Sequence, residues 1–171
     1  MVPTQEILDV DALIESMATQ LRTLIATRKL TDPAMVGIHT GGVWVAAQLH
    51  RKLDLHVPLG SLDISFYRDD FTRIGMNPQV RPSDLPFDID NRHIILVDDV
   101  LHTGRTIRAA LNELFDYGRP ASISLAVLVE RSGRELPIEA DVIGHKINLG
   151  DGDHIKLTGP TPLILELQKN T

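Results

Sequence analysis

The sequence predicts an α/β fold in which a mostly parallel β-sheet is flanked by helices. Short apolar runs typical of buried strands alternate along the chain with segments whose apolar residues recur at helical spacing. Glycine, threonine and charged residues follow directly after several of the apolar runs, where parallel sheets bind their ligands. The chain has 171 residues, of which 43% are hydrophobic, enough for one substantial core. We therefore expect a single domain over residues 1–171.

The first third of the chain predicts a helix, a strand and a second helix. Apolar residues fall on one face of the first segment, and Asp9 or Asp11 is a suitable N-cap for it. The next apolar run is followed by His-Thr-Gly-Gly, a turn sequence that leads into another helical pattern. The predicted elements are a helix over 11–25, a strand over 34–38 and a helix over 43–53.

The next stretch predicts a strand and then a long loop. Residues 59–67 alternate between apolar and polar side chains, which predicts a half-buried strand. All periodicity is lost over residues 68–90, which contain charges and three prolines. A loop of this length within a compact domain is usually functional or mobile, so we expect a mobile lid over the site. Its arginines, Arg68, Arg73 and Arg81, could place positive charge over an anionic substrate.

The segment HIILVDDVLHTGRTIR, residues 93–108, is the most informative part of the chain. Its apolar run predicts a buried strand, Asp98 and Asp99 follow, and a helix is predicted from about Thr106. Adjacent carboxylates can accept hydrogen bonds from sugar hydroxyls, and a glycine-containing loop at a helix N-terminus can bind a phosphate. A plain strand–turn–helix connection would explain one Asp and one Gly, but not Asp-Asp together with Thr-Gly-Arg-Thr. The segment therefore predicts a sugar-phosphate site.

The remaining elements complete the sheet and bring the polar turns together. The helix after the central loop ends at Gly118-Arg119-Pro120, and Arg131 comes soon after the next strand. Because the carboxyl ends of parallel strands share one edge, residues 40–42, 98–106 and Arg131 can meet in one crevice. The later predictions are a strand over 122–129, a polar loop over 131–139, a strand over 140–143 and short segments over 155–157 and 163–167.

Composition excludes several classes of protein. A net charge of −6 with 4% aromatic residues gives no overall attraction to nucleic acid, although a local basic patch stays open. The absence of cysteine excludes disulfides and thiolate catalysis. No apolar run approaches the ~20 residues of a membrane span, and the first residues lack the pattern of a secretory signal, so we expect a cytoplasmic protein without membrane contact. The histidines at 39, 50, 56, 93, 145 and 154 show no metal-ligand spacing.

The central loop resembles the phosphoribosyl diphosphate (PRPP) motif of type I phosphoribosyltransferases. The segments over residues 61–70 and 117–138, together with the chain length, resemble one branch, the PyrR family of bifunctional pyrimidine regulators and uracil phosphoribosyltransferases. The resemblance implies a transferase that converts uracil and PRPP to UMP and diphosphate. It also implies Mg²⁺ bound indirectly through diphosphate and water without a specific protein ligand, a homo-oligomer (a dimer or higher), and regulation by binding the leader RNA of pyrimidine genes.

The resemblance also implies roles for single residues. Asp98 and Asp99 would be catalytic through the ribose, Arg68, Arg81 and Arg131 would contact substrate, and Ile155 would line the base pocket. The family usually has Thr-Arg-Gly where this chain has Gly41 in the middle position, which removes one charge-assisted contact to diphosphate. The implied PRPP- and nucleotide-binding residues are Thr40, Gly41 and Gly42 on the diphosphate side, and Asp98, Asp99, Val100, Leu101, His102, Thr103, Gly104, Arg105 and Thr106 on the ribose-phosphate side.

Several alternatives stay open at this stage. His102 could act as a general base because the pKa of histidine lies near neutrality, or it could simply pack in the loop, which we favour. Arg134 and Glu135 could form a surface ion pair of little energetic value. The other candidate functions are an RNA-binding regulator with little enzyme activity and a purine phosphoribosyltransferase. The residues that motivate RNA binding are Arg22, Arg28 and Lys29.

Overall fold

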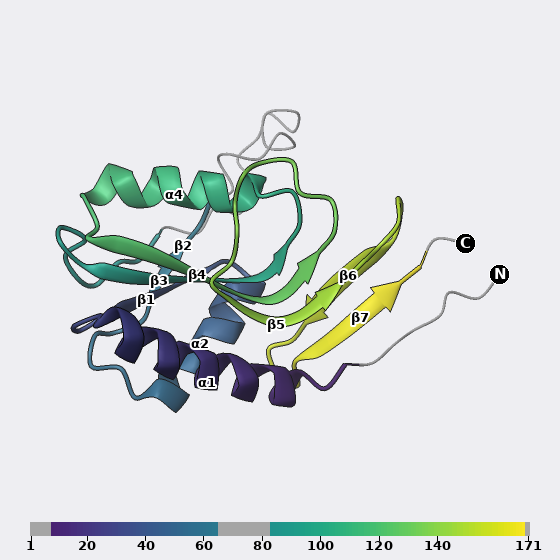
Figure 1. Ribbon diagram of the computed structural model, residues 1–171, viewed down its shortest axis with the longest axis horizontal. Helices are drawn as coiled ribbons and strands as arrows, with labels where there is room; N and C mark the ends of the chain where they lie inside the picture. Colours follow the sequence, from purple (N-terminus) through teal and green to yellow (C-terminus); the bar gives the residue numbers. More distant parts are fainter. Residues whose placement is uncertain (1–7, 65–82, 170–171) are drawn as a thin grey trace.

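In the computed structural model, which describes residues 8–64 and 83–169, five parallel strands form one sheet in the order β2-β1-β3-β4-β5. Helices α1 and α2 cover one face of this sheet and α4 covers the other (Figure 1). The predicted α/β architecture is confirmed. The elements are α1 (Val10–Arg28), β1 (Ala34–Ile38), α2 (Gly41–Leu53), β2 (Gly60–Leu62), β3 (His93–Leu101), α4 (Arg105–Tyr117), β4 (Ser122–Arg131), β5 (Val142–Ile147), β6 (His154–Thr158) and β7 (Ile164–Gln168).

The central strand β3 is apolar because both of its faces are buried. Ile95 and Val97 belong to the hydrophobic cluster beneath α1 and α2, whereas Ile94 and Leu96 belong to the cluster beneath α4. All four side chains are fully buried. A strand covered on both faces loses the alternation of polar and apolar residues, which explains the continuous apolar run in the sequence.

Local sequence accounts for the helix ends. Asp9 is the N-cap of α1, and its Oδ1 accepts a hydrogen bond of 3.1 Å from the Ala12 N–H. Of the two residues considered for this cap, Asp9 and Asp11, the structure therefore has Asp9. Lys29 ends this helix in the left-handed conformation. Helix α4 begins after Gly104, at φ 96°, and ends at Gly118, the predicted stop. Of the described helices, none is long and apolar enough to cross a membrane.

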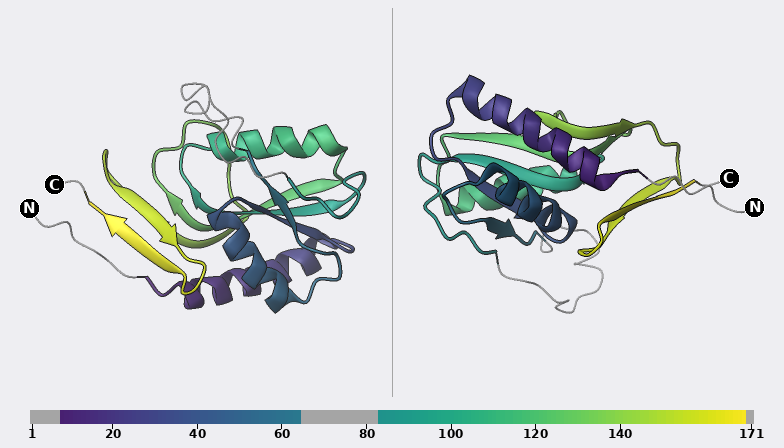
Figure 2. Two further views of the ribbon diagram at one scale, coloured as in Figure 1. Left: turned by 180° about the vertical axis from the view of Figure 1, so that it is seen from behind. Right: turned by 90° about the horizontal axis from the view of Figure 1, so that it is seen from below.

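A separate antiparallel hairpin, β6–β7, follows the main sheet. Both further views show it beside the N-terminal ends of α1 and α2 rather than in the sheet (Figure 2). Its turn approaches Trp44 on α2, because a Cβ built on Gly159 would lie 3.2 Å from Trp44 Cε3. Leu157, Leu165 and Leu167 of the hairpin are buried in the α1–α2 cluster. The short C-terminal segments predicted from sequence are therefore part of the core.

The structure corrects several predicted boundaries. Strand β3 continues to Leu101, so Asp98 and Asp99 lie within the strand and not after it. The strand predicted over 140–143 occupies Val142–Ile147. Of the strand predicted over 59–67, the described part forms β2 over Gly60–Leu62, and residues 65–67 lie outside the described residues. Helix α2 begins at Gly41, two residues before its predicted start. Most of the predicted lid, including Arg68, Arg73 and Arg81, lies outside the described residues.

Candidate functional site

The acidic pair and the glycine turn after β1 meet at the carboxyl edge of the sheet. Strands β1 and β3 are neighbours, with Gly37 paired to Val97, so the start of α2 lies beside the end of β3. A Cβ built on Gly41 would overlap the Asp99 carboxylate, and one built on Gly42 would lie 2.6 Å from the Val97 carbonyl oxygen. Only glycine allows so close an approach of the two segments. The predicted convergence of these two turns is confirmed.

Both carboxylates lie beside the first turn of α2 and are bonded to backbone amides of β3. Asp98 is 5% exposed, and its Oδ1 accepts a hydrogen bond of 2.9 Å from the Asp99 N–H. Asp99 is half-buried on the α2 side, and its Oδ1 accepts one of 2.8 Å from the Val100 N–H. Each aspartate thus has one oxygen bonded to the next amide of the chain, and the second oxygen of Asp99 lies beside Gly41.

The loop between β3 and α4 forms a small polar hollow. Gly104 adopts φ 96°, and the Thr103 hydroxyl accepts a hydrogen bond of 3.2 Å from the Arg105 N–H at the start of α4. The positive end of the helix dipole and the first-turn amides favour an anion at this point. The hollow has a volume of about 130 Å³ and is lined by Val100, Leu101, His102, Thr103, Gly104, Thr106 and Ile107.

The turn at the start of α2 offers backbone donors without side-chain support. Thr40 is the N-cap residue, but its side chain makes no capping hydrogen bond to the helix. Gly41 and Gly42 occupy the first helical turn, and the His39–Thr40 peptide bond is cis. The first-turn N–H groups can bind an anion. In the β3–α4 loop a threonine hydroxyl is bonded to the first amide of the helix. Among the described residues, no side-chain hydrogen bond of this kind is found at the start of α2.

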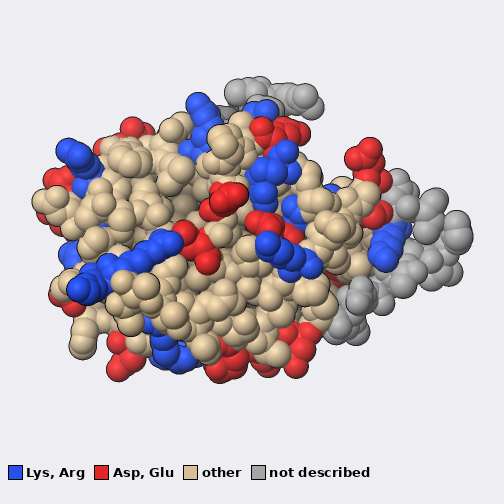
Figure 3. Space-filling model, viewed as in Figure 1, with Lys and Arg blue, Asp and Glu red and all other residues tan. Residues whose placement is uncertain are grey.

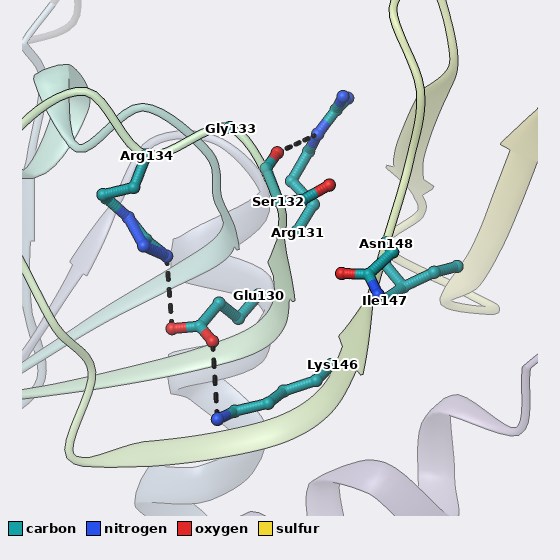
Figure 4. Close-up of a pocket in the computed structure, with 8 residues that line it drawn as sticks. All are labelled: Glu130, Arg131, Ser132, Gly133, Arg134, Lys146, Ile147 and Asn148. Atoms are coloured by element: carbon teal, nitrogen blue, oxygen red, sulfur yellow. Dashed lines mark hydrogen bonds and ion pairs between the residues drawn. The ribbon is translucent and has the colours of Figure 1, made fainter.

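Arg131 is the last residue of β4 and lies at a second, larger hollow at the carboxyl ends of β4 and β5. This hollow has a volume of about 320 Å³ (Figure 4). Arg131 is 9% exposed and its Nη1 donates a hydrogen bond of 2.9 Å to the Asp153 carbonyl oxygen before β6. Figure 4 shows the Arg131 and Glu130 side chains on opposite sides of β4. The residues that line this hollow are Glu130, Arg131, Ser132, Gly133, Arg134, Lys146, Ile147 and Asn148.

Arg134 and Glu135, considered in the sequence as a possible surface pair, each form an ion pair with another residue. Arg134 Nη2 lies 3.2 Å from Glu130 Oε1, and Lys146 lies 3.7 Å from the other oxygen of the same carboxylate (Figure 4). Glu135 instead pairs with Arg105, with 2.9 Å between Oε1 and Nε. The alternative of an ion pair between Arg134 and Glu135 is therefore not the arrangement found, because the loop after β4 directs these neighbours to different elements.

His102 lies against the loop that follows β4. A Cβ built on Gly133 would lie 2.8 Å from His102 Nε2, so the imidazole ring rests on the glycine backbone. Burial lowers the pKa of His102, and the positive charges of Arg131 and Arg134 lower it further, against the opposing effect of Glu135. The imidazole is therefore neutral at pH 7. Of the other histidines, His50 contacts the Val57 carbonyl oxygen at 2.8 Å and His93 contacts the Ser122 hydroxyl at 2.7 Å, both structural roles.

The remaining sequence candidates lie in different environments. Ile155 pairs with Leu167 in the hairpin and packs, partly buried, against the α1–α2 cluster. Arg28 pairs with Asp141 at 2.9 Å, and Arg22 Nη2 donates to the Lys52 carbonyl oxygen at 3.2 Å. Acidic and basic side chains are interspersed on the face shown in Figure 3. The described charges on this face therefore do not form a patch of one sign.

Among the described residues, the acidic pair Asp98 and Asp99 is the candidate for contact with a metal ion. The described residues contain no group of three or more His, Asp or Glu side chains arranged to hold a metal. Mg²⁺ commonly uses one or two carboxylates and completes its octahedron with phosphate oxygens and water. The Asp99 carboxylate, which lies beside Gly41 at the start of α2, is the side chain that would hold such an ion together with substrate oxygens.

Comparisons with known proteins agree with this geometry. The model of the phosphoribosyl transferase domain matches residues 3–162. The bifunctional protein PyrR of Nitrosococcus oceani is 61% identical over 169 residues, covering 98% of this chain and 96% of the relative. That of Pseudomonas aeruginosa is 60% identical over 154 residues, covering 90% and 91%.

Solved structures show the same fold at low sequence identity. The hypoxanthine phosphoribosyltransferase of Trypanosoma cruzi aligns with a TM-score of 0.69 at 21% identity, covering 94% of this chain and 93% of that one. A hypoxanthine-guanine-xanthine phosphoribosyltransferase aligns with a TM-score of 0.68 at 18% identity, covering 96% and 94%.

Proposed function

Because the chain belongs to the phosphoribosyl transferase family and, within it, to the bifunctional PyrR proteins, we propose that its reaction joins uracil to PRPP and releases UMP and diphosphate. The observation that carries this proposal is the meeting of the acidic pair, the β3–α4 loop and the glycine turn of α2 at one edge of the sheet. A pentose with a phosphate at one end and a diphosphate at the other needs these three kinds of contact.

Each part of this edge has a role in the proposal. Asp98 and Asp99 accept hydrogen bonds from the ribose hydroxyls, and the Thr103–Thr106 loop binds the 5′-phosphate at the start of α4. The turn Thr40–Gly42 binds the diphosphate through backbone N–H groups. The hollow beside the loop and the close approach of Gly41 to Asp99 support this assignment.

The chain contributes to the reaction mainly by positioning and electrostatics. When the ribosyl group leaves diphosphate for the base, positive charge develops on the ribose, and the adjacent aspartates stabilise it. Mg²⁺, when bound, neutralises charge on the diphosphate. Arg131 and Ile155 stay predictions as substrate contacts, as do Arg68 and Arg81 in the predicted lid. Because His102 packs against Gly133, we do not assign it as the group that takes the uracil N1 proton, and the departing diphosphate or water can accept that proton.

A four-base assay tests this function most simply. Purified protein is incubated with PRPP and Mg²⁺ and with uracil, hypoxanthine, guanine or orotate, and nucleotide formation is followed. We expect UMP from uracil and little product from the other bases. Product from hypoxanthine or guanine without product from uracil would place the protein in the purine branch. Loss of all activity after chelation of Mg²⁺, restored by its addition, would support the metal requirement.

We also propose that the protein binds pyrimidine leader RNA, since its relatives are named bifunctional. Arg22, Arg28 and Lys29 motivated this expectation, but Arg28 is already paired with Asp141. Labelled leader RNA is titrated at several salt concentrations, with and without UMP. We expect binding that weakens steeply with salt and responds to UMP. No binding at low salt in either condition would leave the enzyme function alone.

The assembly and location of the protein stay predictions. We expect a cytoplasmic homo-oligomer, a dimer or higher, built from one domain per chain. Light scattering after size-exclusion chromatography measures the assembly, and a monomeric mass at micromolar concentration would contradict it.

A further inference from the structure

We propose that residues 132–138, here called the clamp segment, hold the β3–α4 loop in its phosphate-binding conformation, and that Gly133 is a positioning residue for PRPP. This inference rests on the proposed function and extends it to a part of the chain outside the loop itself. The clamp segment leaves the end of β4 and passes along the outer side of the loop.

The clamp segment bonds to a backbone group that must point away from the phosphate. A loop that directs its N–H groups at an anion has to turn carbonyl oxygens outward, where they need other donors. The Thr103 carbonyl oxygen accepts hydrogen bonds from the Glu135 N–H at 3.0 Å and from the Leu136 N–H at 3.1 Å. Both donors belong to the clamp segment, so it satisfies the outward side of the loop.

Side chains of the clamp segment fix the same loop at its glycine. A Cβ built on Gly104 would lie 3.2 Å from Ile138 Cγ1 and 3.4 Å from Leu136 Cβ. The loop backbone therefore rests directly on these two side chains at the residue whose φ of 96° shapes the turn. Arg105 adds an exposed ion pair with Glu135 at 2.9 Å.

Gly133 provides the third contact, with His102. Gly133 has φ 114°, a conformation that side chains disfavour, and its backbone lies where the imidazole packs. A side chain here would strain the backbone and displace the ring, since its Cβ would lie 2.8 Å from Nε2. His102, which directly precedes Thr103, thus packs against the backbone of Gly133 in the clamp segment.

The clamp segment is itself anchored to the sheet. The Ser132 N–H donates to the Ile147 carbonyl oxygen at 3.2 Å. Its hydroxyl accepts from the Leu149 N–H at 2.9 Å and donates to the Leu149 carbonyl oxygen at 3.0 Å. Arg134 contacts Glu130 on β4. A segment fixed to β4 and β5 can therefore serve as a rigid support for the neighbouring loop.

Gly133→Ala tests the proposal, with Gly152→Ala as the matched control. Gly152 also has a positive φ, 83°, but lies in the turn between β5 and β6. In Gly133→Ala we expect the KM for PRPP and the Kd for UMP to rise roughly tenfold, as local strain predicts. The kcat and the KM for uracil should stay within about twofold, because the 5′-phosphate is held equally before and during the reaction. Gly152→Ala should leave all four constants unchanged.

Hydrogen exchange gives a readout that does not depend on activity. Amides of residues 103–106 should exchange faster in Gly133→Ala, and not in Gly152→Ala, while the core strands stay protected in both. If Gly133→Ala does not fold, Ile138→Ala removes the side chain beneath Gly104 and should raise the same two constants. Unchanged PRPP and UMP constants in the folded variant, or a fall in kcat alone, would overturn the proposal.

The two levels of inference can fail separately. A wild-type protein without activity on uracil would refute the proposed reaction. The exchange of the loop amides, and their protection by UMP or inorganic phosphate, would still decide whether the clamp segment holds the loop.

Discussion

The two anion-binding turns at the edge of the sheet are built in different ways. The β3–α4 loop has threonine hydroxyls, an acidic pair before it and a packed segment behind it. The turn at the start of α2 has two glycines and a threonine whose side chain does not cap the helix. The ribose-phosphate end of PRPP would therefore meet a preorganised surface, whereas the diphosphate end would meet bare backbone.

Because the two turns differ, the two ends of PRPP would be bound by different kinds of protein group. Preorganised donors lose little freedom on binding and favour one geometry. At the α2 turn, the absence of a side chain at Gly41 leaves room for the Asp99 carboxylate, which overlaps the position that a Cβ of residue 41 would occupy. We infer that specificity for the ribose phosphate lies in the protein, and that diphosphate depends on Mg²⁺ and the backbone.

The largest effect is expected from Asp99→Asn, which should weaken binding of the ribose by the acidic pair before the β3–α4 loop. Loss of a charged acceptor should reduce binding by about 1.5–3 kcal/mol and lower kcat/KM for PRPP by roughly 10- to 100-fold. Asp116→Asn, an exposed change near the end of α4, is the matched control. Thermal unfolding should be alike in both variants. An unaltered PRPP affinity and rate in Asp99→Asn would remove the assignment of the acidic pair.

Gly41→Ala tests the turn at the start of α2, where diphosphate would be bound by backbone N–H groups. Its Cβ would overlap the Asp99 carboxylate, so the aspartate must move, at a penalty of about 1–3 kcal/mol. We expect a loss of about tenfold in kcat/KM for PRPP, and Gly41→Arg should not regain it despite the added charge. Gly150→Ala, whose Cβ would make an ordinary contact of 3.5 Å with Asp153, is the control. Higher affinity for diphosphate in Gly41→Arg at full turnover would contradict this account.

A smaller effect is expected from His102→Phe. The lowered pKa of His102 keeps it neutral in the folded protein at pH values where the unfolded chain begins to bind a proton. Stability should therefore fall as pH drops below about 6.5, and this component should vanish in the variant. The rate between pH 6 and 9 should keep the same profile, with a modest change in PRPP affinity. Loss of the acidic limb alone, with lower turnover, would instead make His102 the base.

The smallest effect is expected from Glu135→Gln. Its ion pair with Arg105 joins two side chains that are each more than half exposed, so solvent screens the attraction. The KM for PRPP should change less than about threefold, in contrast to Gly133→Ala. A change as large as that of Gly133→Ala would mean that charge, and not packing, holds the loop.

The sequence predicted the elements that local patterns define. The strand Ala34–Ile38 was predicted at its observed bounds, because a continuous apolar run followed by a glycine turn has few alternatives. The end of α4 at Gly118 was also predicted. The end of β3 was missed, since carboxylates interrupt the apolar run while backbone pairing continues, with Asp98 opposite Val127 and Leu101 opposite Glu130.

The site was predictable in its components but not in its contacts. The acidic pair, the loop and the glycine turn were found because each follows an apolar run in the sequence. The contact between His102 and Gly133 joins segments that no spacing relates, and the pairing of Glu135 with Arg105 depends on the path of the loop after β4. The glycine at position 133 was the one local signal in the sequence, and a glycine in a polar loop does not indicate which side chain it contacts.

Calorimetric titration of the wild-type protein with UMP and with uridine tests the central claim most directly. The two ligands differ only in the phosphate that the β3–α4 loop is proposed to hold. We expect UMP to bind at least about tenfold more tightly than uridine, because charged hydrogen bonds contribute about 1.5–3 kcal/mol each. Equal affinities for UMP and uridine would contradict the assignment of this loop as the phosphate site.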